Sequence, residues 1–198
     1  KTLSESGSGG SVVYESMLRI QDGASVTLRS QRTAIAALSL AEQARLELGE
    51  GELIIGSTDV DQVRQHLLAG RITSSLSDEL HRPGYRAEAG GQVLVRYAWA
   101  GDADLNDVVD LSDLQALALH WQQLQAQVWT QGDFDYDGAV TIADLRLLAG
   151  NWPRADAAGL AAALASLGLP AVPVPEPGCL AGVACAGMLL SRRSPRRR

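Results

Sequence analysis

The sequence predicts a mixed fold class: a β-rich N-terminal part, then a small all-α module of two loop–helix units, then a short transmembrane helix. Three observations predict it. Alternating apolar residues recur at an offset of 20 residues in the N-terminal half. An acidic segment with an apolar stripe behind it recurs at an offset of 31 residues. A run of uncharged residues precedes an arginine cluster at the C-terminal end.

Composition limits the classes of partner. The 198 residues carry a net charge of −6, and five arginines lie among the last seven positions, so the rest of the chain is more acidic still. An acidic body favours cations or basic surfaces and argues against nucleic acid. Both cysteines lie in the C-terminal uncharged run, so the body holds no disulfide. We expect residues 1–10 (KTLSESGSGG) to be a linker and the chain to be the C-terminal piece of a longer protein.

The 20-residue repeat predicts β-strands. LRIQDGASVTL (Leu18–Leu28) aligns with LSLAEQARLEL (Leu38–Leu48), and alternate positions are apolar in both segments. This period indicates strands with one buried face. Stacked rungs of a β-solenoid would give such a repeat, and so would a pair of hairpins. ELIIG (Glu52–Gly56) would be the next strand.

The rest of the β-rich region, which we place at residues 11–100, contains one predicted helix. Ser57–Gly70 has Asp59 and Asp61 in its first turn and ends at a glycine, as helices commonly do. The polar segment Ile72–Gly91 is predicted to be a loop. QVLVRYAW then alternates apolar and polar residues, which predicts a last strand before the acidic segments.

The two acidic segments, GDADLNDVVDLSDL (Gly101–Leu114) and GDFDYDGAVTIADL (Gly132–Leu145), have the spacing of calcium loops. Calcium takes six to eight oxygen ligands, which a twelve-residue loop supplies from positions 1, 3, 5, 7, 9 and 12. In the first segment these positions are Asp102, Asp104, Asn106, the carbonyl of Val108, Asp110 and Asp113. In the second segment they are Asp133, Asp135, Asp137, the carbonyl of Ala139, Thr141 and Asp144.

The pattern therefore predicts two Ca²⁺ sites, the second of them tighter. Position 6 needs a left-handed backbone, and it is Gly138 in the second segment but Asp107 in the first. Val140 at position 8 is expected to pair the two loops side by side. The alternative is an acidic, solvated linker with chance spacing. A shared apolar stripe at spacing i, i+3, i+7 argues against that alternative and predicts two packed helices. The stripe consists of Leu114, Leu117 and Trp121 in one unit, and Leu145, Leu148 and Trp152 in the other.

Paired loop–helix units without a preceding helix, and with Asp at position 12, resemble type I dockerin repeats. Dockerins attach polysaccharide-degrading enzymes to cohesin-bearing scaffolds. The resemblance covers residues 101–153 and implies a cohesin-like partner protein. In that family loop positions 10 and 11 recognise cohesin. Here those positions are Leu111 and Ser112 in the first loop, and Ile142 and Ala143 in the second.

The C-terminal end is predicted to be a sorting signal. Residues 154–174 form a linker in which Ala155–Leu167 is helical, and residues 175–198 form the tail. The tail has Pro175, Glu176 and Pro177, then 13 uncharged residues and the arginine cluster. As a helix the uncharged run would reach roughly 20 Å, and the alternative is a buried helix. The order of the three parts resembles the PEP-CTERM signal of bacteria with an outer membrane, which implies processing by an exosortase and a transient inner-membrane anchor.

No catalytic motif is recognisable. The three histidines, His66, His81 and His120, are scattered without zinc-ligand spacing. We therefore expect a non-catalytic, calcium-binding protein that is exported to the cell surface or beyond and mediates calcium-stabilised attachment to another protein. The alternative is the dockerin end of a polysaccharide-degrading enzyme whose catalytic domain lies upstream.

Overall fold

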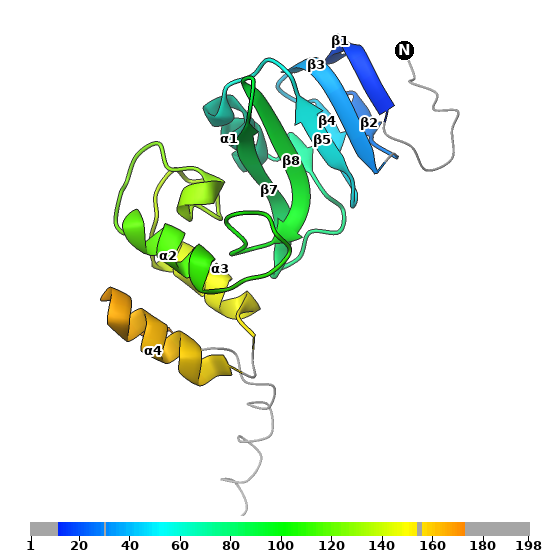
Figure 1. The fold of residues 1–198 in the computed structure, drawn as a ribbon. Coiled ribbons are helices and arrows are strands. Elements are labelled where there is room, and N and C mark those ends of the chain that lie inside the picture. Colours follow the sequence, from blue (N-terminus) through cyan, green and yellow to red (C-terminus); the bar gives the residue numbers. More distant parts are fainter. Residues whose placement is uncertain (1–11, 30, 154–155, 173–198) are drawn as a thin grey trace, which may run out of the picture.

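Two parallel stacks of strands form the N-terminal half in the computed structural model, which describes residues 12–29, 31–153 and 156–172. The first stack contains β1 (Val12–Ile20), β3 (Arg32–Leu40) and β5 (Glu52–Ile55). The second contains β2 (Ser25–Thr27), β4 (Arg45–Glu47) and β6 (Ile72–Thr73). Figure 1 shows the chain passing alternately between the two stacks.

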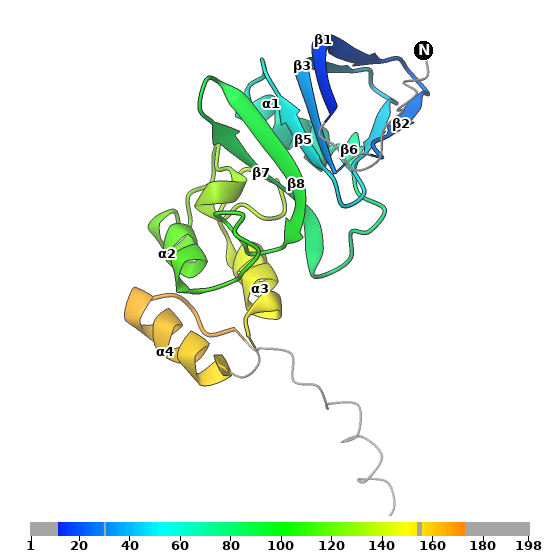
Figure 2. The same ribbon diagram turned by 45° about the vertical axis from the view of Figure 1, so that its right-hand side comes forward.

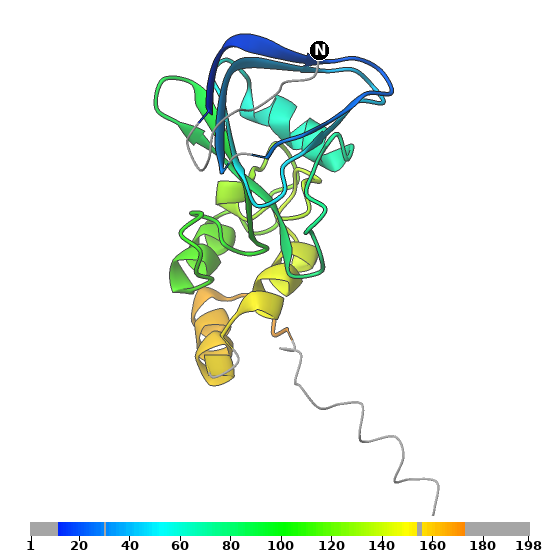
Figure 3. The same ribbon diagram turned by 90° about the vertical axis from the view of Figure 1, so that its right-hand side faces the viewer.

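The register of these strands follows the sequence repeat. Leu18 pairs with Leu38 between β1 and β3, and Val26 pairs with Leu46 between β2 and β4. Both pairs are parallel and 20 residues apart, so the repeated segments lie on top of one another instead of folding back as hairpins. Figure 3 shows these turns of the chain one behind the other. Together the two stacks form a parallel β-coil over residues 12–73, which we call the coil. Its inward leucines and isoleucines are buried.

Helix α1 (Val60–Leu68) widens the third turn of the coil. Leu46 of β4 pairs with Ile72 of β6 at an offset of 26 residues, because the helix is inserted between β5 and β6. The side chain of Asp59 accepts a hydrogen bond from the backbone N–H of Asp61, so Asp59 caps the helix, which begins at Val60 and lies within the predicted range of residues 57–70. Val63 and Leu67 of α1 are buried in the coil.

An antiparallel hairpin of β7 (His81–Glu88) and β8 (Gln92–Trp99) ends the parallel stack. β8 pairs with β5, and β7 forms the edge of the five-stranded sheet. The prediction of a loop over residues 72–91 is therefore wrong. The strand β7, HRPGYRAE, has no apolar alternation to reveal it, because arginines and a glycine occupy one of its faces.

More helices follow in the part of the chain that the structure describes (Figures 1 and 2). α2 (Leu111–Leu119) and α3 (Ile142–Asn151) lie behind the two acidic segments, with a 3₁₀ turn η1 (Trp129–Gln131) between them. α4 (Ala157–Leu167) packs against α2, and its leucines at 160 and 164 are buried. Of the predicted apolar stripes, the four leucines and Trp152 are buried, while Trp121 is partly exposed.

The predicted fold class is wrong in one important respect. The loop–helix units are not a separate all-α module, because their buried residues and those of the β-sheets form one hydrophobic core within a mixed α/β chain. Trp129 of η1 lies over Gly84 of β7, where an added Cβ would be 2.9 Å from the indole Cε2. The Tyr136 hydroxyl donates to the carbonyl of Pro83 at 2.8 Å. The hairpin thus lies between the coil and the acidic loops (Figure 2).

The predicted transmembrane helix also finds no counterpart in the described part of the chain. None of the helices there is both long and apolar enough to cross a lipid bilayer. The uncharged run at residues 178–190 and the Pro175–Pro177 motif, from which the sorting signal is predicted, lie outside the described residues.

The two loop–helix units pack on each other through reciprocal glycine contacts. A Cβ added to Gly101, ahead of the first loop, would lie 2.6 Å from the Cα of Leu148 in α3. A Cβ added to Gly132, ahead of the second loop, would lie 2.8 Å from the Cα of Leu117 in α2. Both glycines have positive φ angles, 109° and 100°. The sequence repeat is therefore also a structural repeat, in which each unit's glycine receives the other unit's helix.

Candidate metal centre

Each acidic loop is closed by the aspartate at position 12. We call residues 102–113 loop 1 and residues 133–144 loop 2. In loop 1, Asp113 Oδ1 accepts hydrogen bonds from the N–H groups of Ala103 (2.8 Å) and Asp104 (3.4 Å), and Oδ2 accepts one from Asp110 at 2.8 Å. Asp113 is also the third residue of α2, so it completes a capping box at the helix start.

Loop 2 repeats the same set of bonds. Asp144 Oδ1 accepts from the N–H groups of Phe134 (2.8 Å) and Asp135 (3.3 Å), and Oδ2 accepts from Thr141 at 2.9 Å. Asp144 stands in the capping box of α3 as Asp113 does in that of α2. In both loops one carboxylate therefore ties the first residues of the loop to the first turn of the helix.

The aspartate at position 1 accepts from the backbone N–H at position 6. Asp107 donates to Asp102 Oδ2 at 2.8 Å, and Gly138 donates to Asp133 Oδ2 at 3.0 Å. Both donors have left-handed backbones, with φ of 71° at Asp107 and 85° at Gly138. Asp107 therefore adopts the conformation that glycine adopts in loop 2, at the cost that a Cβ carries there. Its own carboxylate is bonded to Arg96.

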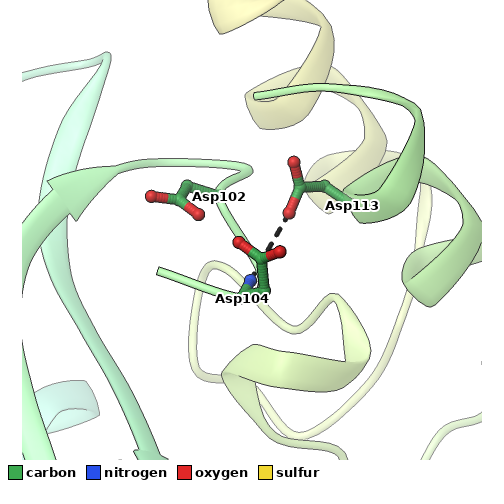
Figure 4. Close-up of side chains that lie close together, drawn as sticks. All are labelled: Asp102, Asp104 and Asp113. Atoms are coloured by element: carbon green, nitrogen blue, oxygen red, sulfur yellow. Dashed lines mark hydrogen bonds between the residues drawn. The ribbon is translucent and has the colours of Figure 1, made fainter. Parts of the chain in front are cut away.

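These bonds gather carboxylates into two clusters. One oxygen each from Asp102, Asp104 and Asp113 lie within 4.8 Å of one another in loop 1. Figure 4 shows these three side chains close together. In loop 2 the same holds for Asp133, Asp135 and Asp137. In the described part of the chain, these are the two groups of acidic, histidine or cysteine side chains close enough to hold a metal ion. Either cluster could hold one.

The remaining predicted ligands lie beside the clusters, with different neighbours. Asn106 donates from its side chain to Asp104 Oδ2 at 3.0 Å, which keeps it at the loop 1 cluster. Asp110 instead caps α2, because its Oδ1 accepts from Ser112 N at 2.7 Å. Thr141 caps α3 in the same way, with its Oγ1 accepting from Ala143 N at 3.1 Å. Position 9 is thus occupied with capping in both loops.

Asp144, the remaining carboxylate ligand predicted in loop 2, is held at the loop by its backbone bonds. At position 7, the backbone N–H groups of Val108 and Ala139 donate to Asn106 Oδ1 (2.8 Å) and Asp137 Oδ1 (2.7 Å). The carbonyls of Val108 and Ala139 stay predicted ligands.

The predicted pairing of the loops through position 8 takes another form. Val140 is fully buried, but its backbone pairs with the segment that follows α2. Its N–H donates to the carbonyl of Gln123 at 2.8 Å, and its carbonyl accepts from the N–H of Gln122 at 2.9 Å. These two backbone hydrogen bonds and the glycine contacts join the two units. The segment after α2, and not loop 1, therefore pairs with Val140.

Burial disfavours the ionised form of the loop carboxylates and so raises their pKa values. Asp102, Asp113, Asp133 and Asp144 are almost completely buried. Burial raises the pKa of Asp133 to about 7, and neighbouring aspartates add to the effect. It also raises the pKa of Asp102 to about 6 and that of Asp144 to about 6. Bonds from backbone N–H groups oppose these shifts without cancelling them. A cation bound in either loop would offset the cost of burying these charges and the repulsion between them.

One atom fits such a cation particularly well. The Oδ1 atom of Asp133 is buried and has no hydrogen-bond partner within the described residues. Its counterpart in loop 1 is different, because Asp102 Oδ1 accepts from Asn106 N at 3.0 Å. A buried carboxylate oxygen without a partner costs free energy that a metal ion would recover. The candidate metal ligands of both loops are hard oxygen atoms, which suit Ca²⁺ or Mg²⁺ more than zinc or copper.

Sequence reasoning missed four arginines that hold the outer side of the loops. Their guanidinium groups donate to loop carbonyls: Arg64 to Tyr136, Arg82 to Phe134, Arg86 to Asp104 and Arg96 to Leu105. The alternation of Arg82, Gly84 and Arg86 was the available signal, since these three share one face of a strand.

The aromatic and histidine residues have separate positions. Trp129 is fully buried and donates from Nε1 to the carbonyl of Asp102, whereas Trp99 is 38% exposed and lies against His81. His66 is buried in α1 and His120 caps the C-terminal end of α2, so the three histidines lie in different elements. No protein-family model, curated protein or solved structure matches this chain.

The metal-free protein should become more stable as the pH falls from 8 to 5. The pKa values of Asp133 (about 7), Asp102 (about 6) and Asp144 (about 6) exceed their ordinary value of 3.8, so the folded state takes up protons that the unfolded chain does not. The stability is then lost as the pH rises through 6 to 7. His66 acts in the opposite sense, because burial lowers its pKa.

Thermal unfolding in chelator, measured from pH 5 to 8 for the native chain and for Asp133→Asn, checks this expectation. The substitution removes the aspartate whose pKa is raised most, so it should increase the Tm at pH 8 and flatten the pH profile. His66 contributes equally to both proteins and drops out of the difference. Parallel pH profiles for the two proteins would contradict the assignment of Asp133.

Proposed function

We propose that this chain is a non-catalytic, calcium-binding part of an exported surface protein, in which two dockerin-like loops stabilise attachment to another protein. The observation that carries the proposal is the buried Asp133 carboxylate, whose Oδ1 has no partner among the described residues while its neighbours Asp135 and Asp137 add like charge. Such a cluster is unfavourable on its own and favourable around a cation.

Calcium is the cation that the ligand set favours. Each loop offers carboxylates and carbonyls from irregular loop positions, and Ca²⁺ accepts six to eight such oxygens in irregular geometry, whereas Mg²⁺ requires a near-ideal octahedron. In loop 1 Asp102, Asp104, Asn106 and Asp113 would supply side-chain oxygens, while Asp110 caps α2. In loop 2 Asp133, Asp135, Asp137 and Asp144 would do so, while Thr141 caps α3. The hydrogen-bonded Oδ1 of Asp102 and the free Oδ1 of Asp133 support a tighter second site.

The predicted partner positions are accessible, which supports a role in attachment. Leu111 is 46% exposed and Ile142 is 37% exposed, each at the first residue of the helix behind its loop. Ser112 is exposed and Ala143 partly so. Because position 12 ties each loop to the start of its helix, a bound ion would fix the same helix turns that present these side chains. Calcium would in this way control the shape of the attachment surface.

Calorimetric titration of the chelator-stripped full chain with Ca²⁺ should show two binding events. Asp133→Ala should abolish the tighter event, because it removes the position 1 ligand of loop 2. Asp22→Ala is the matched control, since it deletes an equal charge on an exposed turn of the β-rich part, outside both loops. It should retain both events. A flat titration of the native chain would rule out the calcium proposal.

A cohesin-bearing protein should co-elute with the full chain in millimolar Ca²⁺ and separate from it in chelator. Replacing both Leu111 and Ile142 with glutamate should abolish co-elution, because the change places charges at the two apolar contact positions. Leu119→Glu is the control, since Leu119 is 77% exposed but lies at the far end of α2. Co-elution that survives chelator would exclude calcium-stabilised attachment, and co-elution that survives the double substitution would exclude this surface.

Export and surface sorting rest on the sequence of the tail alone. If an exosortase processes the Pro175–Pro177 signal, intact mass spectrometry of protein extracted from the cell surface should find residues 179–198 missing. Replacing the two prolines with alanine should leave the full-length chain unprocessed in the membrane fraction. Mature surface protein that retains the arginine cluster would contradict the sorting proposal.

A further inference from the structure

Four arginines of the β-rich part reach across to the two acidic loops. Arg86 and Arg96 donate to loop 1, at 2.8 Å to the carbonyl of Asp104 and at 3.3 Å to that of Leu105. Arg64 and Arg82 donate to loop 2, at 3.0 Å to the carbonyl of Tyr136 and at 3.2 Å to that of Phe134. Each loop thus receives two guanidinium groups from residues outside the repeat.

Three of these arginines share one face of the hairpin. In the register of β7 and β8, Gly84 pairs with Arg96, and Arg82 and Arg86 lie two residues on either side of Gly84. Directly paired residues and alternate residues of a strand point to the same side of a sheet. Gly84 leaves room on that face for Trp129, so the loops can approach closely enough for the arginines to reach their carbonyls.

One of the two bonds to each loop falls on the same loop position. Leu105 and Tyr136 both occupy position 4, and both have left-handed backbones, with φ of 59° and 70°. Their carbonyls are bound by Arg96 in loop 1 and by Arg64 in loop 2. A left-handed backbone at a non-glycine residue is unfavourable unless other contacts hold it. The arginines supply those contacts at the point where each loop bends.

The arginines also oppose the charge of the loops. Residues 101–152 contain nine aspartates and a single basic residue, Arg146, so the countercharge must come from outside this segment. Arg96 makes a direct ion pair with Asp107 at 2.5 Å. Arg64 lies at Gly138, where an added Cβ would be 2.9 Å from its Nη1 atom. Guanidinium groups at these points lower the repulsion among the loop carboxylates.

We propose that Arg64, Arg82, Arg86 and Arg96 are positioning residues that hold both loops in their ligand-bearing shape before a metal ion binds. This inference rests on the proposed calcium function. Because guanidinium groups and Ca²⁺ both bring positive charge to the same two loops, they partly substitute for each other. The arginines therefore stabilise the metal-free protein more than the calcium-loaded one, and the fold of the loops depends less on calcium than their aspartates alone would require.

Thermal unfolding of the full chain, in chelator and in millimolar Ca²⁺, tests the inference. In the double variant Arg64→Gln/Arg82→Gln, the Tm in chelator should fall by roughly 5 °C, since two hydrogen bonds from charged donors are lost. In Ca²⁺ the Tm should fall by less than half as much. Arg32→Gln is the matched control, because Arg32 lies on β3 beside Glu52 and should give equal, small shifts in both conditions.

Further variants separate charge from packing. Arg64→Lys/Arg82→Lys retains the charge and should recover at least half of the Tm that is lost in chelator. If the glutamine pair does not fold, Arg82→Gln alone is measured in the same two conditions. Equal losses of Tm in chelator and in Ca²⁺ would show ordinary structural contacts and overturn the inference. A native chain whose Tm does not respond to Ca²⁺ would instead refute the calcium function itself.

Discussion

The bonds that Asp113 and Asp144 make to backbone N–H groups hold the C-terminal half of the structure together. Each of these buried carboxylates accepts from the start of its loop and from the helix cap, so the loop closes into a ring around the remaining aspartates. The geometry of the ligand clusters follows from that closure. So does the direction of each helix, because the same residue stands in the first helical turn. Loop and helix form a single unit for this reason.

Closure of the loops brings buried aspartates close together, and arginines of the β-rich part offset their repulsion. An aspartate brought into the core with other aspartates nearby is unfavourable, and the fold answers with arginines from α1, β7 and β8 that bond to the outer carbonyls. The hairpin therefore serves two purposes. It ends the parallel coil by pairing with β5, and it supports the loops on the face around Gly84. This dual use explains why coil and loops share one core instead of forming two domains.

The sequence predicted features that depend on spacing, and it failed where distant segments meet. Most strand positions, the presence of a helix within residues 57–70, the helix stripes and the clustered aspartates follow from short-range spacing. Alternation alone could not distinguish stacked rungs from hairpins, since both bury every second residue. The strand β7 was missed because Arg82, Gly84 and Arg86 read as polar when nothing is known to pack on them. Only the folded loops show why that face is polar.

The reciprocal contacts of Gly101 and Gly132 make the two repeats mutually dependent. Each glycine admits the backbone of the other unit's helix, at Leu148 and at Leu117, so neither helix has a complete packing surface within its own repeat. A chain that lost one repeat would leave the helix of the other repeat exposed, and the space beside its glycine would be unfilled. A bulky residue in place of either glycine would push the two halves apart. Neither repeat can therefore be deleted without disrupting the packing of the other. Substitutions in one repeat are constrained by the shape of the other repeat.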